Sequence, residues 1–152
     1  MKSKQAASKV LLDTSFILPT LGIDVGEEVS VGLKKLANIK AELYYSSFSI
    51  LEALWVAARL TKTPTFNIGR FSHGLRSIIE SGKYGKVEED SETFKESLRL
   101  HMLGHKDIID NILYATSTQL NLKLLTLDTE LREFIRQKGL IDTLISPNQI
   151  AA

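Results

Sequence analysis

Two short apolar segments, far apart in the sequence, each run directly into an aspartate. The segment 9–12 precedes Asp13 near the N-terminus, and the segment 123–127 precedes Asp128. A short apolar run bounded by polar residues is typical of a buried β-strand. Ligands in open α/β sheets bind at the edge formed by the carboxyl ends of the strands. We therefore expect these two strands to deliver both carboxylates to one edge of a sheet.

Strands and helices alternate along the rest of the chain. Apolar residues at helical spacing predict helices at 27–38, 48–60, 66–81, 91–102, 107–120 and 129–138. Short apolar runs predict further strands at 41–45, 86–88 and 144–147. Such alternation is typical of a parallel sheet covered on both faces. We expect an α/β fold, a three-layer α/β/α sandwich around a short, mainly parallel sheet.

The composition limits the class of protein. With 152 residues, of which 43% are hydrophobic, the chain is long enough for one domain, 1–152, in which residues 1–8 form a frayed tail. The sequence contains no cysteine, which excludes disulfides, thiolate metal sites and a cysteine nucleophile, and we expect a cytoplasmic protein. A net charge of +1 gives no overall field that attracts nucleic acid. The first apolar run is too short to span a membrane, so we expect no membrane association.

Both aspartates that end a strand also have a purely structural explanation. Thr14 and Ser15 follow Asp13, and Asp128 lies between Thr126 and Thr129. Aspartate at a strand-to-helix junction commonly caps the next helix, and this alternative stays open for each aspartate taken alone.

Glu52 has a similar alternative. Ser49 lies three residues before it, the spacing of a capping box, in which Glu52 would bond only the helix backbone. However, Glu52 also lies at the border of the apolar face formed by Leu51, Leu54 and Ala58. From that position its carboxylate can lean toward the sheet edge.

Asp107 and Asp110 both open the predicted helix 107–120. The apolar face of this helix is defined by Ile109, Ile112, Leu113 and Thr116. On a helical wheel, Asp110 lies about 120° and Asp107 about 180° from the centre of that face. Asp110 is therefore the better candidate for an inward site and Asp107 for a cap, while Asp107 stays open as an alternative metal ligand.

Carboxylates at two strand ends and two helix starts would gather at one edge of such a sheet. Like charges so close repel one another unless a cation lies among them. Oxygen ligands, without cysteine or paired histidines, favour Mg²⁺ or Mn²⁺ over Zn²⁺. The pattern indicates a divalent metal site.

The remaining chemistry-bearing residues have simpler interpretations. The histidines show no metal-ligand spacing, so we expect them at the surface or at helix ends, with His105 near enough to the acids to touch a substrate. Trp55 and the pair Tyr44 and Tyr45 fit core or strand packing. We expect a solvated surface for the densest basic region, which comprises Arg59, Lys62, Arg70, Arg76, Lys83 and Lys86.

The four acids follow a characteristic order along the chain. Asp13 follows the first predicted strand, Glu52 lies in the helix after the second, and Asp110 lies eighteen residues before Asp128. In this respect the sequence, over about 9–147, resembles PIN-domain proteins of the kind found as ribonuclease toxins in VapBC toxin–antitoxin pairs. The resemblance implies an acidic metal-binding and catalytic quartet of Asp13, Glu52, Asp110 and Asp128, supported by the hydroxyls of Ser15 and Thr126. It also implies an RNA substrate, an antitoxin partner and a homodimer.

Our hypothesis from the sequence is an endoribonuclease that depends on one or two Mg²⁺ or Mn²⁺ ions. One alternative is a non-catalytic RNA-binding or assembly module with the same fold. A second alternative is a phosphoryl-transfer enzyme with Asp13 as nucleophile. The haloacid-dehalogenase-like hydrolases that this alternative resembles have a second aspartate two residues on, where Ser15 stands here.

Overall fold

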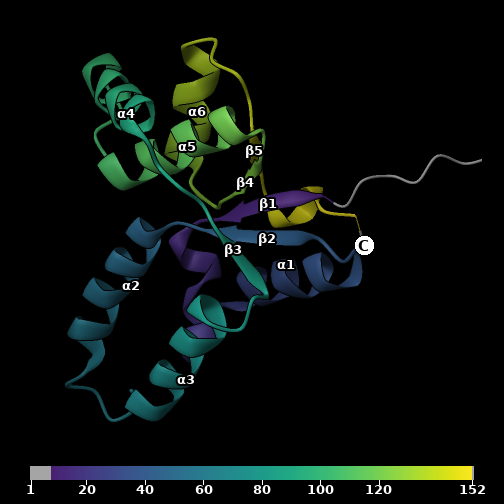
Figure 1. Ribbon diagram of the computed structural model, residues 1–152, viewed down its shortest axis with the longest axis vertical. Coiled ribbons are helices and arrows are strands. Elements are labelled where there is room, and N and C mark those ends of the chain that lie inside the picture. Colours follow the sequence, from purple (N-terminus) through teal and green to yellow (C-terminus); the bar gives the residue numbers. More distant parts are fainter. Residues whose placement is uncertain (1–7, 152) are drawn as a thin grey trace, which may run out of the picture.

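The computed structural model describes residues 8–151, so most of the tail predicted at 1–8 lies outside it. Five parallel strands form one sheet in the order β3-β2-β1-β4-β5 (Figure 1). The strands are β1 (Lys9–Leu12), β2 (Glu42–Tyr45), β3 (Tyr84–Lys86), β4 (Lys123–Leu125) and β5 (Leu144–Ile145). The predicted α/β/α sandwich around a parallel sheet is confirmed.

Six α-helices form the two outer layers. One layer contains α1 (Glu27–Asn38), α2 (Ser47–Leu60) and α3 (Ile68–Ile79). The other layer contains α4 (Ser91–Leu103), α5 (Ile108–Leu120) and α6 (Thr129–Gln137), on the opposite side of the sheet in Figure 1. Three short 3-10 turns complete the chain: η1 (Thr14–Phe16), η2 (Leu18–Leu21) and η3 (Pro147–Gln149). Among these described helices, none is both long and apolar enough to cross a membrane.

The central strand β1 is buried on both faces and separates two hydrophobic cores. Val10 and Leu12 pack with residues of α1, α2 and α3, whereas Leu11 packs with residues of α5 and α6. Successive side chains of a strand point to opposite faces, so three consecutive apolar residues are needed here. The carboxyl end of β1 is thereby fixed between the two layers.

The order of the strands reverses direction at β1. From β1 the chain adds β2 and β3 on one side, and β4 and β5 on the other. The residues after β1 and β4 therefore meet at the point where open α/β sheets bind ligands. The backbone N–H of Asp13 donates to the carbonyl oxygen of Leu125 at 3.2 Å, which ties the ends of the two strands together.

The third strand begins two residues earlier than the predicted strand at 86–88. Gly85 explains the difference, because a Cβ at this position would lie 2.7 Å from the ring of Tyr44 on β2. Only glycine permits this close pairing of β2 and β3. Gly74 of α3 acts in the same way, since its Cβ would lie 2.2 Å from the carbonyl oxygen of Thr20 in η2.

Three large apolar residues of α2 face outward, and the prediction that Trp55 packs in the core was wrong. Trp55 is 52% exposed, and Leu51 and Leu54 are also exposed. The buried positions of α2 are instead Ser49, Ala53 and Ala57. These small side chains let the helix approach closely, so the bulky residues cannot fit on that side.

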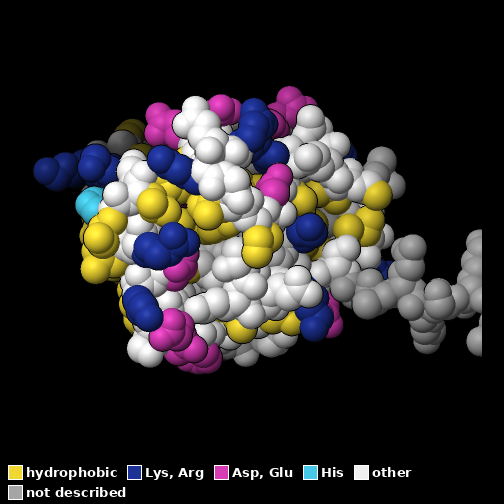
Figure 2. Space-filling view, turned by 90° about the horizontal axis from the view of Figure 1, so that it is seen from above, with side chains coloured by type: hydrophobic (Ala, Val, Ile, Leu, Met, Phe, Trp, Pro, Cys, Tyr) yellow, Lys and Arg dark blue, Asp and Glu magenta, His cyan; other side chains and the backbone are white. Residues whose placement is uncertain are grey.

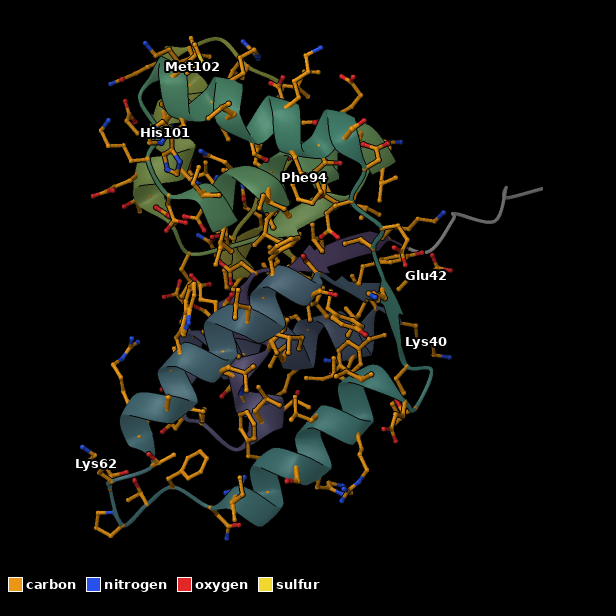
Figure 3. The ribbon with its side chains drawn as sticks, turned by 60° about the vertical axis from the view of Figure 1, so that its left-hand side comes forward. Lys40, Glu42, Lys62, Phe94, His101 and Met102 are labelled. Carbon is orange, nitrogen blue, oxygen red and sulfur yellow. The ribbon has the colours of Figure 1, made fainter. Side chains whose placement is uncertain are left out.

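A similar exposed apolar stripe runs along α4. Phe94, Leu98 and Met102 follow at helical spacing and are 43%, 57% and 77% exposed. Figure 3 labels Phe94 and Met102 on this outer helix. In Figure 2, Lys and Arg side chains are interspersed with Asp and Glu side chains, which agrees with the net charge of +1.

Candidate functional site

Asp13 lies directly after β1, where it both caps η1 and faces a cavity. Its Oδ1 accepts a hydrogen bond from the backbone N–H of Ser15 at 3.0 Å. Burial raises the pKa of the Asp13 carboxyl to about 6, although hydrogen bonds from the Thr126 hydroxyl and from backbone amides oppose this rise. Because a carboxylate has two oxygens, Asp13 can cap η1 and also line the cavity.

Glu52 lies in the second turn of α2 and is not part of a capping box. The residue that caps α2 is Ser46, whose Oγ accepts from the backbone N–H of Phe48 at 3.1 Å. The hydroxyl of Thr14 donates a hydrogen bond to Oε1 of Glu52. This bond joins the residue after Asp13 to α2 and fixes the Glu52 carboxylate beside the cavity.

Asp107 and Asp110 occupy different places at the start of α5, as the helical wheel indicates. Oδ1 of Asp107 accepts from the backbone N–H of Asp110 at 3.0 Å, so Asp107 caps the helix. Asp107 is exposed and lines a neighbouring groove, whereas Asp110 is half-buried and lines the acidic cavity.

Asp128 follows β4 and caps α6. Its Oδ1 accepts from the backbone N–H of Leu131 at 3.1 Å. The hydroxyl of Thr126 accepts from the backbone N–H of Asp128 at 3.1 Å, while the same side chain hydrogen-bonds Asp13. Thr126 thus connects the two aspartates that end β1 and β4.

A cavity of about 280 Å³ collects these side chains at the sheet edge. Its lining consists of Asp13, Thr14, Ser15, Glu52, Asp110, Leu127 and Asp128. All four acids singled out in the sequence line this cavity, with Ser15 beside them. Thr126 lies just behind the wall, buried and bonded to two of the acids.

The carboxyls of Asp110 and Asp128 shift each other's pKa in opposite directions. Burial, the hydrogen bond to Asp128 and the charges of Asp107, Asp128 and Asp13 raise the pKa of Asp110. Burial acts in the same direction on Asp128, but hydrogen bonds from protonated Asp110 and from α6 amides hold its pKa below the ordinary value. These opposite shifts favour one negative charge on the pair over two when no cation is bound.

His105 was expected at the surface or at a helix end, but its ring is buried beside this pair. Its exposed fraction is 8%. Within the described chain, a ring nitrogen of His105 and one oxygen each from Asp110 and Asp128 lie within 4.8 Å of one another. Asp13 and Glu52 line the same cavity but do not join this tightest group. The sequence indicated that His105 lies near the acids, but not that its ring is buried beside them, because it lies in the loop between α4 and α5.

The donors of the cavity fit a divalent cation. Carboxylates are hard ligands, and hydroxyl or amide groups hold three of them in place. A divalent ion would relieve the repulsion that helps to raise the pKa of Asp110, and it would take the place of the proton. Residues of four different elements are thus placed as a metal site requires.

Comparisons with known proteins agree with this architecture. The family model described as "PIN domain" matches residues 10–136. A search of curated proteins found no match. Among solved structures, a toxin–antitoxin complex from Klebsiella pneumoniae aligns with 15% identity and a TM-score of 0.58, covering 91% of this chain and 97% of that chain.

Two further structures share the fold at low sequence identity. The crystal structure of VapBC2 from Rickettsia felis, bound to a DNA fragment from their promoter, aligns with 14% identity and a TM-score of 0.61, covering 91% of this chain and 98% of that chain. PAE2754 from Pyrobaculum aerophilum aligns with 20% identity and a TM-score of 0.52, covering 90% of each chain. The family model covers most of the sequence, and the chain therefore belongs to the PIN domain family, whose members are nucleases.

Proposed function

We propose that this chain is an endoribonuclease that hydrolyses RNA phosphodiester bonds with Mg²⁺ or Mn²⁺ held by Asp13, Glu52, Asp110 and Asp128. The observation that carries the proposal is the convergence of these carboxylates, from two strand ends and two helices, on one cavity. Membership of the PIN family supports a hydrolase that acts on nucleic acid. Single-stranded or looped RNA is the proposed substrate, since an open cavity at a sheet edge accepts an extended backbone.

A divalent ion supplies Lewis-acid activation of water and charge neutralisation at the phosphodiester. The protein contributes positioning. Thr126 and backbone amides hold Asp13, and Thr14 holds Glu52. No protein nucleophile is needed, and the Ser15 hydroxyl, which lines the cavity, would bind a phosphate oxygen.

The same proposal extends to a toxin with an antitoxin partner. One structure with this fold is described as a toxin–antitoxin complex, and another is VapBC2 bound to a DNA fragment from their promoter. An apolar groove of about 420 Å³ adjoins the acidic cavity and shares Glu52 with it; its lining includes Phe48, Leu51, Trp55 and Ile108. A polypeptide bound in this groove would lie beside the acidic cavity and block RNA.

A homodimer is the proposed assembly state. The exposed stripe on α4, formed by Phe94, Leu98 and Met102, is the apolar surface that a second copy would cover. Light scattering after size-exclusion chromatography should give twice the mass of one chain. Leu98→Glu should convert the protein to a monomer, whereas a monomeric wild type would contradict the proposed dimer.

Cleavage of a fluorescently labelled single-stranded RNA tests the catalytic proposal. The wild type should cut with Mn²⁺ or Mg²⁺ and stop in EDTA, and Asp13→Asn should be inactive. Glu133→Gln, on the exposed face of α6, serves as the matched control. Equal cleavage in EDTA, or by Asp13→Asn, would remove this mechanism, and metal-independent RNA binding without cleavage would favour the non-catalytic module.

A further inference from the structure

A buried network fixes the orientation of His105 and decides which ring nitrogen is available. The amide nitrogen of Asn111 donates to the carbonyl oxygens of His105 at 2.7 Å and Ser97 at 3.3 Å. Its Oδ1, at 2.7 Å from Nδ1 of His105, must therefore be an acceptor, and Nδ1 must carry the proton. In the neutral tautomer that this bond selects, Nε2 has the free lone pair.

The environment of the ring keeps it in this position. Asn111 is fully buried, and the ring of Phe134 packs against His105 with 5.2 Å between centroids. Within residues 8–151, the side-chain hydrogen bond of His105 is the one through Nδ1.

The spacing fits ligands of a common ion. Nitrogen and oxygen ligands lie about 2.0–2.2 Å from a transition metal, so donors on opposite sides of an ion are about 4 Å apart. The His105 nitrogen and the oxygens of Asp110 and Asp128 lie within 4.8 Å of one another, slightly wider than this. A histidine that binds metal also usually donates its other N–H to a fixed acceptor, which is the role of Asn111 here.

We propose that Nε2 of His105 is a metal ligand together with Asp110 and Asp128. The site would then combine nitrogen and oxygen donors, and imidazole favours first-row transition ions over Mg²⁺. Of the two ions expected from the acids alone, the chain would select Mn²⁺. This inference rests on the proposed metal site and is independent of whether RNA is the substrate.

Pulsed electron paramagnetic resonance of Mn²⁺ bound to the full chain tests the proposal directly. The wild type should show nitrogen modulation that changes when histidine is labelled with ¹⁵N. His105→Asn retains an N–H donor for Asn111 but removes Nε2, and it should lose this signal. His73→Asn, on the exposed face of α3, should keep it.

Calorimetric titration with Mn²⁺ and with Mg²⁺ separates a ligand from a structural residue. His105→Asn should weaken Mn²⁺ binding by at least about 10-fold, and Mg²⁺ binding by much less. Bound Mn²⁺ without nitrogen modulation in the wild type would overturn the proposal, as would equal weakening for both ions. A wild type that binds neither ion would instead contradict the metal site of the proposed function.

Discussion

The two halves of the acidic cavity are organised differently. In one half, Asp13 and Glu52 are each held by a threonine hydroxyl from another part of the chain, Thr126 and Thr14. In the other half, Asp110 and Asp128 lie close together, and their carboxyls shift each other's pKa in opposite directions. The carboxylates of the first half are therefore held in place before an ion binds. In the second half, the negative charge of the carboxylates needs a proton or a cation to compensate it.

This difference predicts separate roles for the two halves of the cavity. Hydrogen bonds to a carboxylate favour its charged form and fix its direction. Close carboxylates bind a divalent ion tightly, since the ion removes their repulsion. We therefore expect the Asp110–Asp128 half to dominate ion affinity and the Asp13–Glu52 half to dominate the positioning of the reacting groups.

The largest effect is expected for Asp110→Asn. This substitution should weaken Mn²⁺ binding by at least about 100-fold, because it removes a direct ligand rather than a supporting one. RNA cleavage should fall with it. Asp107→Asn is the matched control, since asparagine also caps a helix well, and it should leave both ion affinity and cleavage within about twofold of the wild type. The reverse ranking of the two variants would make Asp107 the ligand.

The second prediction concerns stability without metal. A raised carboxyl pKa means that the folded protein binds the proton more tightly than the unfolded chain, where the ordinary value is 3.8. This stabilisation is complete below 3.8 and is lost as the pH rises through about 6 for Asp13, and at higher pH for Asp110. The thermal midpoint of metal-free protein should therefore fall between about pH 5 and about pH 8.

The variant Asp110→Asn tests the contribution of Asp110 to this pH dependence. The uncharged amide avoids the repulsion, so the variant should be more stable than the wild type near pH 8, by about 1–2 kcal/mol in the free energy of unfolding. The advantage should vanish near pH 5 and also when Mn²⁺ saturates the wild type. If the thermal midpoints of the two proteins depend on pH in the same way across this range, Asp110 does not have the raised pKa on which the prediction rests.

A smaller effect is expected for Thr14→Val. The substitution keeps the size of the side chain and removes the donor to Glu52. Loss of this hydrogen bond should lower the free energy of unfolding by about 1 kcal/mol. Cleavage should fall by about 10-fold while Mn²⁺ affinity stays nearly constant. Thr118→Val, in a helix outside the cavity, controls for loss of a hydroxyl. A large loss of Mn²⁺ affinity in Thr14→Val would contradict the proposed difference between the two halves of the cavity.

The positions of the four acids could be predicted because topology determines them. Strands that end in Asp13 and Asp128 must meet at one edge once both belong to a parallel sheet. The start of α5 placed Asp110 inward and Asp107 outward for the same geometric reason. For Glu52, the predicted place was correct, but the apolar face used to argue for it turned out to be exposed.

Other features depend on packing between distant segments, which periodicity does not show. The pattern of α2 identifies Leu51, Leu54 and Trp55 as one face, but only the tertiary structure shows that the small residues on the opposite side contact the core. His105 becomes part of the site through Asn111 and Phe134, which lie on two other elements. The spacing of residues along the sequence predicts neither contact.

The most direct test is the anomalous difference density of crystals soaked in Mn²⁺. We predict a peak inside the cavity at the carboxyl ends of β1 and β4, in contact with Asp110 and Asp128 and with Asp13 on its other side. Absence of a peak there at saturating Mn²⁺, or density only at surface carboxylates, would contradict the metal site and with it the proposed ribonuclease.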